Sequence, residues 1–314
     1  MKASVIIPTY NRSDYLKDTI NCLLKQSFPI DQFEILVVDN SLDARFKEMI
    51  KSMNHPNVRY IWEKRPGAHR ARNTGALEAK GDVLVFIDDD ELFDQNLLHF
   101  MVSSFDNKKV GCTGGKMLPK FEAEIPDYFN LFNPGDTTHL DLGEEPRILK
   151  APDEIWGGNM AVRRDVFLKV GGMNPDIFPD KLMWLTGDGE GGLQMKIRRA
   201  GYEIFYEPRS CVYNRIGASR LSVDFLISRR TYRALTMSFT NIRELNKKPN
   251  HVFQILRHSL RCYVNLIDYS FFKKFSSPLE KRLETLFWRI RAEHHIRAAI
   301  NKKFRNYILQ ESYL

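Results

Sequence analysis

The sequence contains few cysteines, and they are not arranged for a disulfide framework or a zinc site. Its 314 residues include four cysteines, which lie far apart and form no CxxC pair. We therefore expect reduced thiols in a cytoplasmic protein. No apolar run approaches the roughly 18 residues that identify a membrane-spanning helix. The N-terminus runs straight into a strand-like segment, so we expect no secretory signal.

Glycine is absent from a segment where many nucleotide-binding enzymes need it. The first strand-like run is followed by Pro8–Arg12, which contains no glycine. A glycine-rich phosphate loop near the first strand is typical of nucleotidyltransferases and related α/β enzymes. Its absence argues against that class, which we keep as an alternative.

The composition is that of a folded protein with unevenly distributed charge. With 43% hydrophobic residues the chain can bury a full core, and its length fits one large α/β domain with an appendage, or two domains. The net charge is +8, and the excess of Lys and Arg lies in the last third of the chain. A basic region suggests an anionic membrane surface, phosphorylated substrate or nucleic acid as partner, and the alternative is a solvated helix face.

Apolar runs and helical patterns alternate in the first third of the chain. This order predicts a parallel sheet with right-handed crossovers, and ligands bind such sheets at the carboxyl ends of the strands. Residues 117–155 are irregular, and residues from 221 onward are mostly helical, with breaks at Pro249 and at Ser276–Pro278. The predicted strands are residues 4–7, 34–38, 58–62 and 83–87, and the predicted helices include residues 14–25, 71–79, 164–170 and 187–200.

Three consecutive acids, Asp88, Asp89 and Asp90, follow the apolar run of residues 83–87. Carboxylates packed together repel and raise one another's pKa. A divalent cation relieves that repulsion, and Mg²⁺ or Mn²⁺ held by one or two carboxylates together with substrate phosphates is a common arrangement. The alternative is that Asp90 caps a helix that starts near Glu91, but a cap needs only one acid.

Four motifs occur in order within the first 90 residues. They are ASVIIPTYNR from Ala3, VVDNS from Val37, RARNTG from Arg70 and GDVLVFIDDD from Gly81. Together they resemble the nucleotide-sugar half of the family 2 glycosyltransferases with the GT-A fold, and a looser resemblance continues to about residue 215. The resemblance implies an α/β fold with a Rossmann-like, mostly parallel sheet over residues 1–215, followed by a helical, basic C-terminal region over residues 216–314.

The resemblance also implies which residues bind the donor. Arg72 and Asn73 open a predicted helix whose N-terminus favours a diphosphate, although they are also explained as surface residues. By resemblance Asp39 accepts a hydrogen bond from uracil, Asp88 binds the ribose, and Asp90 binds the metal together with Asp88. Asp89 is a further donor-binding candidate, although on an extended backbone it points to the other side. The segment that lines the nucleoside pocket comprises Pro8, Thr9, Tyr10, Asn11 and Arg12.

Two further segments are candidates for acceptor binding and catalysis. Trp156, Gly157, Gly158 and Asn159 combine an aromatic platform with an amide, or else form a packed Trp beside a tight turn. Glu190 lies where the family carries its catalytic base, with Asp188 as the rival acid. Alternatively, these acids only complement the dipole of the helix that follows.

The sequence departs from the family pattern at three positions. Asn40 stands where a second acid is frequent, Gly189 stands where an acid usually precedes the base, and Asn214 stands where many relatives carry a metal-binding histidine. Asn214 is a poorer ligand, so the metal would be held mainly by Asp90, the diphosphate and water.

The function implied by the resemblance is transfer of a sugar, from a UDP-linked donor, to an acceptor hydroxyl with inversion. Such an enzyme would use Mg²⁺ or Mn²⁺, act on a saccharide or lipid-linked saccharide acceptor in bacterial-type polysaccharide or glycoconjugate synthesis, and bind no nucleic acid. The alternatives are a catalytically silent nucleotide-sugar-binding or scaffold protein and another nucleotide-binding α/β enzyme.

A segment of the C-terminal region suggests contact with the inner face of the cell membrane. Residues 263–275 interleave apolar side chains, including Phe271 and Phe272, with Lys273 and Lys274. Basic residues beside exposed aromatic residues suit a membrane interface. The alternative is that these aromatic residues pack against the catalytic domain.

Overall fold

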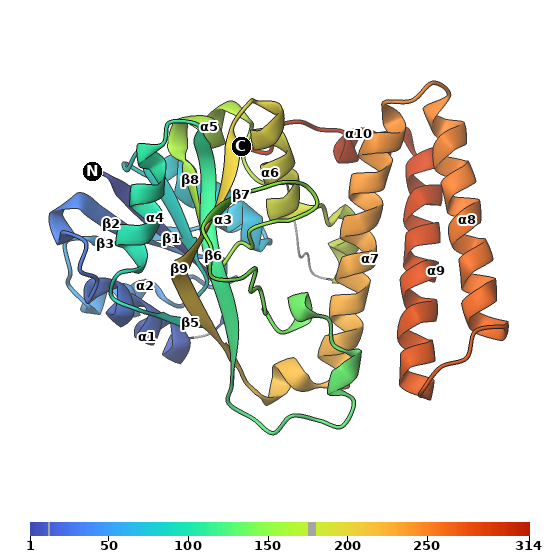
Figure 1. The fold of residues 1–314 in the computed structure, drawn as a ribbon, viewed down its shortest axis with the longest axis horizontal. Coiled ribbons are helices and arrows are strands. Elements are labelled where there is room, and N and C mark those ends of the chain that lie inside the picture. Colours follow the sequence, from blue (N-terminus) through green and yellow to red (C-terminus); the bar gives the residue numbers. More distant parts are fainter. Residues whose placement is uncertain (12, 175–179) are drawn as a thin grey trace.

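The computed structural model describes residues 1–11, 13–174 and 180–314. A curled sheet with helices on both faces occupies one side of the molecule, and three long helices stand beside it (Figure 1). Arg12, one of the predicted donor-binding residues, lies outside the described residues.

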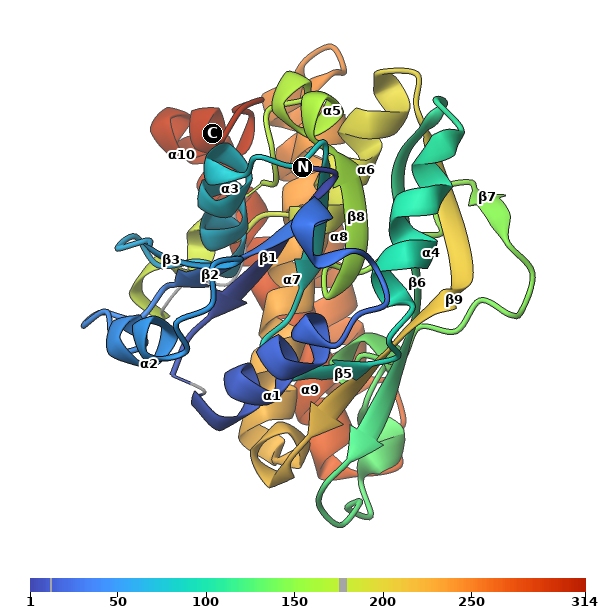
Figure 2. The ribbon, with the colours of Figure 1, turned by 90° about the vertical axis from the view of Figure 1, so that its left-hand side faces the viewer.

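The first part of the sheet is parallel, as the sequence predicts. Strands β1 (Ala3–Thr9), β2 (Phe33–Asp39), β3 (Val58–Trp62) and β4 (Val83–Ile87) lie in the order β3-β2-β1-β4. Every residue of β1, β2 and β4 is buried, because helices cover both faces of the sheet. One face carries α1 (Ser13–Leu24), α2 (Lys47–Ser52) and α4 (Leu97–Ser103), and the other carries α3 (Ala68–Glu78), α5 (Arg164–Lys169) and α6 (Gly189–Arg199) (Figure 2).

Pro8 ends the pairing of β1 on one side only. The sequence suggests that this proline stops the strand, but β1 continues to Thr9 alongside β2, while its pairing with β4 ends at Ile6. Proline lacks the N–H that a second ladder would need. The backbone pairing of β1 and β4 therefore stops before their carboxyl ends, and polar residues follow each strand.

The second part of the sheet is mixed. Strand β8 (Asn159–Arg163) runs antiparallel to β4, and the long strands β6 (Val110–Phe121) and β9 (Glu203–Ile216) pair beyond it. Residues 117–155 are thus less irregular than predicted, because β6 extends to Phe121 and β7 (Arg147–Leu149) pairs with β9.

The alternative interpretation of Asp90 as a helix cap is wrong. The acids lead into the short strand β5 (Glu91–Phe93), which pairs with β9 so that Glu91 lies opposite Asn214. Helix α4 begins only at Leu97. The pairing of β5 with β9 brings the acid cluster to a residue more than 120 positions farther along the chain.

The C-terminal region is helical, with breaks where the sequence predicts them. It consists of α7 (Val223–Asn246), α8 (His251–Phe271), α9 (Pro278–Ile300) and α10 (Lys302–Ile308). The Ser222 and Ser277 hydroxyls cap α7 and α9 by accepting hydrogen bonds from the backbone N–H groups of Phe225 and Glu280. Strand β9 ends at Ile216, and the domain boundary near residue 215 stays a prediction. None of the helices in the described parts of the chain is long and apolar enough to cross a membrane.

We expect Gly115→Ala to lower the free energy of unfolding by about 2–3 kcal/mol, because extra atoms in a packed interior force the backbone apart. A Cβ at this position would overlap the carbonyl oxygens of Glu207 and Ser210, where β6 shifts register against β9. Urea unfolding measures the change. Gly135→Ala is the matched control, since its Cβ would meet only the Trp156 ring at 3.8 Å. Equal stability of the two variants would contradict the packing described here.

Candidate active site

Helix α3 connects two of the predicted acids. Arg72 donates from Nη2 to Asp88 Oδ1 at 2.5 Å, directly after β4. One turn earlier on the same helix, His69 Nε2 lies 2.8 Å from Glu190 Oε2. Residues three apart share one face of a helix. The predicted donor-side acid and the predicted base are therefore both paired with side chains of α3.

The environment of Glu190 keeps its carboxylate ionised. Burial alone would raise the pKa of Glu190, but the positive charges of His69 and Arg72 and the hydrogen bond to His69 hold that pKa well below its ordinary value. Glu190 stands in the first turn of α6, where the helix dipole also favours negative charge.

The contact with His69 explains why glycine precedes Glu190. Gly189 has φ of +46°, in the left-handed region, and a Cβ at this position would overlap the His69 ring. The acid that usually precedes the base in the family would thus be strained and would collide with His69. Glycine at position 189, where the family usually has an acid, therefore leaves space for the His69 ring that pairs with Glu190.

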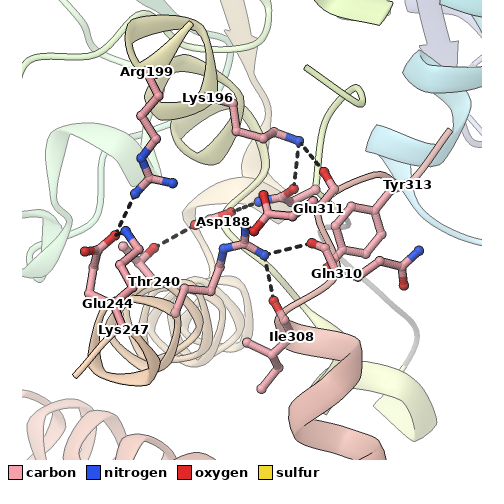
Figure 3. Close-up of polar contacts among 12 residues, drawn as sticks. Asp188, Lys196, Arg199, Thr240, Glu244, Lys247, Ile308, Gln310, Glu311 and Tyr313 are labelled. Carbon is pink, nitrogen blue, oxygen red and sulfur yellow. Dashed lines mark hydrogen bonds and ion pairs between the residues drawn. The ribbon is translucent and has the colours of Figure 1, made fainter. Parts of the chain in front are cut away.

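Asp188, the rival candidate for the base, belongs to a different network (Figure 3). Its oxygens accept hydrogen bonds from Asn174 Nδ2 at 2.5 Å and from Thr240 Oγ1 of α7 at 2.9 Å. Burial raises the pKa of Asp188, although these two bonds oppose the increase. The carboxylate thus ties the start of α6 to α7.

The same network includes the last residues of the chain (Figure 3). Lys196 of α6 donates from Nζ to the carbonyl oxygens of Gly172 and Glu311. Arg243 of α7 donates to the carbonyl oxygens of Ile308 and Gln310. The segment after α10 is therefore held between α6, α7 and the turn that follows α5.

Glu154 is a further acid at the site. A Cβ on Gly191 would lie 2.9 Å from Glu154 Oε2, so this carboxylate lies against the first turn of α6. Burial, and next the negative charge of Glu190, raise the pKa of Glu154 to about 7. Glu154 and Glu190 are thus neighbouring acids whose pKa values shift in opposite directions.

Asp90 lies beside Asn214, as expected for a residue in the histidine position of relatives. Asn214 Nδ2 donates to Asp90 Oδ1 at 3.0 Å, and Arg220 Nη1 donates to Asp90 Oδ2 at 3.0 Å. Arg220 stands on the turn η6 (Ala218–Leu221) after β9. In the part of the chain that the structure describes, no three His, Cys, Asp or Glu side chains gather as metal ligands.

The remaining acids of the cluster point in different directions. Asp89 Oδ2 accepts a hydrogen bond from Thr9 Oγ1 at 2.7 Å, which joins the ends of β4 and β1. Glu91 is buried with its Oε2 accepting from the backbone N–H of Asp88. Burial and next the charge of Asp88 raise the pKa of Glu91 well above its ordinary value.

The glycines of the predicted acceptor segment lie against these charged groups. A Cβ on Gly157 would lie 2.8 Å from Arg72 Nη1, and a Cβ on Gly158 would overlap Glu91 Oε1. Trp156 is partly buried at the edge of the core. Asn159 is fully buried, and its amide donates to the carbonyl oxygens of Lys116 and Ser210. A contact between Asn159 and an acceptor would have to break one of these bonds, and it stays a prediction.

The predicted donor-binding residues are divided between exposed and buried positions. Tyr10 is 55% exposed, and Asn11 beside it has φ of +61°. Asp39, by contrast, is fully buried and accepts four hydrogen bonds from within the protein, from the Ser41 N–H and hydroxyl, the Phe46 N–H and the Tyr60 hydroxyl. A uracil base would have to displace one of these donors, and the contact stays a prediction.

Two asparagines near the predicted donor site bind the backbone. The Asn73 amide exchanges two hydrogen bonds with the backbone of Met173. Asn40 Nδ2 donates to the carbonyl oxygens of Glu63 and Arg65, and its Oδ1 accepts from the Gly67 N–H, just before α3. Asn40 thus fixes the start of α3, which an acid in its place could not do with the same two donated bonds.

Sequence reasoning did not assign roles to His69, Glu154 and Arg220. His69 has a partial signal, since it stands three residues before Arg72, although the helix predicted over residues 71–79 begins after it. Arg220 and Glu154 have none, because they reach the site from an irregular turn and from a loop.

The comparisons with known proteins identify the family and the fold of the chain. The family described as "Glycosyl transferase family 2" matches residues 4–171, which is more than half of the chain. The chain belongs to glycosyl transferase family 2. The resemblance stated from its motifs is thereby confirmed.

The curated relatives are similar over different parts of the chain. Glycosyltransferase AglE of Haloferax volcanii is 32% identical over 36% of this chain and 38% of its own length. The poly(ribitol-phosphate) beta-N-acetylglucosaminyltransferase TarS of Staphylococcus aureus is 35% identical, but only 18% of its length is matched. A glucosyl-dolichyl phosphate glucuronosyltransferase of Haloferax volcanii is 25% identical over 73% of this chain and 74% of its own length.

Solved structures share the fold. A mannosyltransferase from Pyrobaculum calidifontis, in complex with GDP-Man and Mn²⁺, matches 95% of this chain and 74% of its own with a TM-score of 0.54 and 18% identity. Residues 1–349 of TarS match 98% of this chain and 83% of that structure, also with a TM-score of 0.54, at 20% identity. The predicted GT-A fold, with its helical C-terminal extension, is thereby confirmed.

We expect Glu154 to make the stability of the protein fall as pH rises between about 4.5 and about 7. In this window the folded protein keeps a proton on Glu154 that the unfolded chain, with an ordinary pKa of 4.5, has released. The free energy of unfolding therefore decreases with pH. Glu154→Gln should flatten this part of the profile in urea titrations across the window. Glu124→Gln, at an exposed acid, is the control, and an unchanged slope in Glu154→Gln would contradict the prediction.

Proposed function

We propose that this family 2 protein transfers a sugar from a nucleotide sugar to an acceptor hydroxyl, with Glu190 as the general base. The observation that carries the proposal is the shared use of α3, which pairs Arg72 with Asp88 and His69 with Glu190. In this proposal one helix, α3, holds both the donor-side acid Asp88 and the acceptor-side base Glu190. A positioned base and a nearby cation are the parts that a single in-line displacement with inversion requires.

Glu190 is suited to receive the proton of the acceptor. Its carboxylate is ionised at neutral pH, as a base requires, and the contact with His69 fixes the orientation of that carboxylate. The lowered pKa by itself makes Glu190 a weaker proton acceptor. Glu154, with its pKa raised to about 7, is close enough to influence the charge of the acceptor side. Asp188 is bonded to Asn174 and Thr240, so we assign it a positioning role.

The donor side offers cations for a diphosphate. Arg72 and the N-terminal end of α3 carry positive charge beside Asp88. Tyr10 is exposed enough to stack on a base. We propose a UDP-linked sugar, as the resemblance implies; among the similar structures one holds GDP-Man and another UDP. The acceptor we propose is a saccharide or lipid-linked saccharide, in line with the named activities of the relatives.

A divalent cation fits this site under one condition. Asp90 and Asp88 offer carboxylate oxygens and Asn214 offers an amide oxygen, which suits Mg²⁺ or Mn²⁺ when the diphosphate and water complete the coordination. The condition is that Arg220 leaves both Asp90 Oδ2 and Asn214 Oδ1, since its Nη1 donates to both oxygens. A bound cation would neutralise the departing diphosphate. Arg72 and Arg220 supply positive charge at the same place from the chain itself.

We expect Glu190→Gln to lower kcat by at least about a hundredfold with little change in donor Kd, since a general base contributes about 10²–10⁴-fold. The measurements are steady-state kinetics with a panel of UDP- and GDP-sugars and donor binding by calorimetry. Asp188→Asn is the matched control, and it should reduce stability more than turnover because it alters bonds between α6 and α7. An active Glu190→Gln variant would exclude Glu190 as the base.

We expect Asp90→Asn to reduce Mn²⁺-dependent transfer by at least about a hundredfold, the loss that corresponds to about 2.7 kcal/mol of leaving-group stabilisation. Initial rates across a Mn²⁺ titration, together with a melting curve, test this. Asp106→Asn changes an exposed acid away from the site and serves as control. Turnover of Asp90→Asn close to that of the control would remove the metal assignment.

A further inference from the structure

Helix α8 carries an apolar stripe that faces solvent along its whole length. Its buried side, formed by Ile255, Ser259 and Cys262, contacts the rest of the molecule. The opposite side repeats large apolar residues at intervals of three and four, which places them on one face of a helix. These residues are between 42% and 78% exposed, and they are Phe253, Leu256, Leu260, Val264, Ile267 and Phe271.

The stripe lies at the outer boundary of the molecule. Figure 1 shows α8 as the element farthest from the sheet, with α9 between α8 and α7. Phe271 and Phe272, at the end of the helix, are 78% and 75% exposed. The alternative interpretation, in which these aromatic residues pack against the catalytic domain, is therefore wrong. Large contiguous apolar patches of this kind mark surfaces that bind a membrane or another protein.

Positive charge accompanies the stripe. Arg257 and Arg261 each follow a stripe residue by one position, so both lie on the same flank of it, and both are exposed. Lys273 and Lys274 are exposed directly after Phe272, and Lys248 is exposed shortly before α8. Asp268 is the only acid within α8. The helix thus combines a continuous apolar face with basic residues on one flank and at both ends.

We propose that α8 binds an anionic lipid surface, lying in its plane. The apolar stripe enters the boundary between headgroups and acyl chains, and Arg257, Arg261 and the lysines contact the headgroups, as in other interfacial helices. A second copy of the chain would cover the stripe as well. A symmetric pair, however, presents the same patch twice and brings like charges to one interface. Charge complementarity therefore favours anionic lipid. This proposal is independent of the donor and of Glu190.

The test is co-sedimentation of the full chain with vesicles of phosphatidylglycerol and phosphatidylcholine, compared with vesicles of phosphatidylcholine alone. We expect binding to the anionic vesicles to be at least about tenfold tighter, and weaker at high salt. Leu260→Ser/Phe271→Ser should abolish it. The matched control is Leu42→Ser/Leu77→Ser, which changes two other exposed leucines and should bind as the unaltered chain does.

Charge is tested separately with Arg257→Gln/Arg261→Gln, which alters surface side chains and keeps the apolar stripe. This variant should lose most of the preference for anionic vesicles, and it keeps the test valid if the serine variant does not fold. An unchanged preference would overturn the proposal, as would negligible or equal binding of the unaltered chain to both kinds of vesicle. A dimer in light scattering that the serine substitutions dissociate, without vesicle binding, would assign the stripe to a second copy instead.

Discussion

The pairing of carboxylates that have been removed from water is the constraint on which the site depends. A buried or partly buried carboxylate is costly unless a cation or several donors meet it. Asp88, Asp90 and Glu190 are each met by a cation from another element, namely Arg72, Arg220 and His69. These pairs connect the end of β4 to α3, α3 to α6, and the acid cluster to η6. Neutralising one of these acids would therefore weaken the contact between its own element and the element that carries its partner.

The sequence predicts the parallel strands because their residues are buried on both faces. The segments that form β1, β2 and β4 are mostly apolar. They can therefore be recognised as continuous apolar runs, without an alternation of apolar and polar residues. Strand β5 follows three acids and has three residues, which is too short for a pattern. Strand β5 is held by its pairing with β9, more than 120 residues away. Strand β6 mixes glycine and lysine with apolar residues, so it also lacks a continuous apolar run. Pairing between strands so far apart in the sequence cannot be predicted from the residues of either strand alone.

The same distinction holds for the site. The acids and Arg72 were found because they stand in recognisable motifs, whereas His69 and Arg220, which pair with Glu190 and Asp90, were not assigned roles. Arg220 meets Asp90 across 130 positions of sequence. The glycines are the informative exception: Gly158 and Gly189 occupy positions where a Cβ would overlap Glu91 or His69. The structure thus explains these two glycines, because the side chains of Glu91 and His69 occupy the space that a Cβ would need.

The contacts of residues 308–313 have a consequence for the order in which the chain folds during synthesis. Lys196 and Arg243 hold the carbonyl oxygens of residues 308, 310 and 311, and the Tyr313 N–H donates to the Gly171 carbonyl oxygen. Chains are synthesised from the N-terminus at about 5–20 residues per second. The sheet can therefore form on the ribosome well before these contacts exist. The helix that bears Glu190 gains these supports only when residues 308–313 emerge, so a chain stalled after α9 would have a sheet but a helix α6 without them.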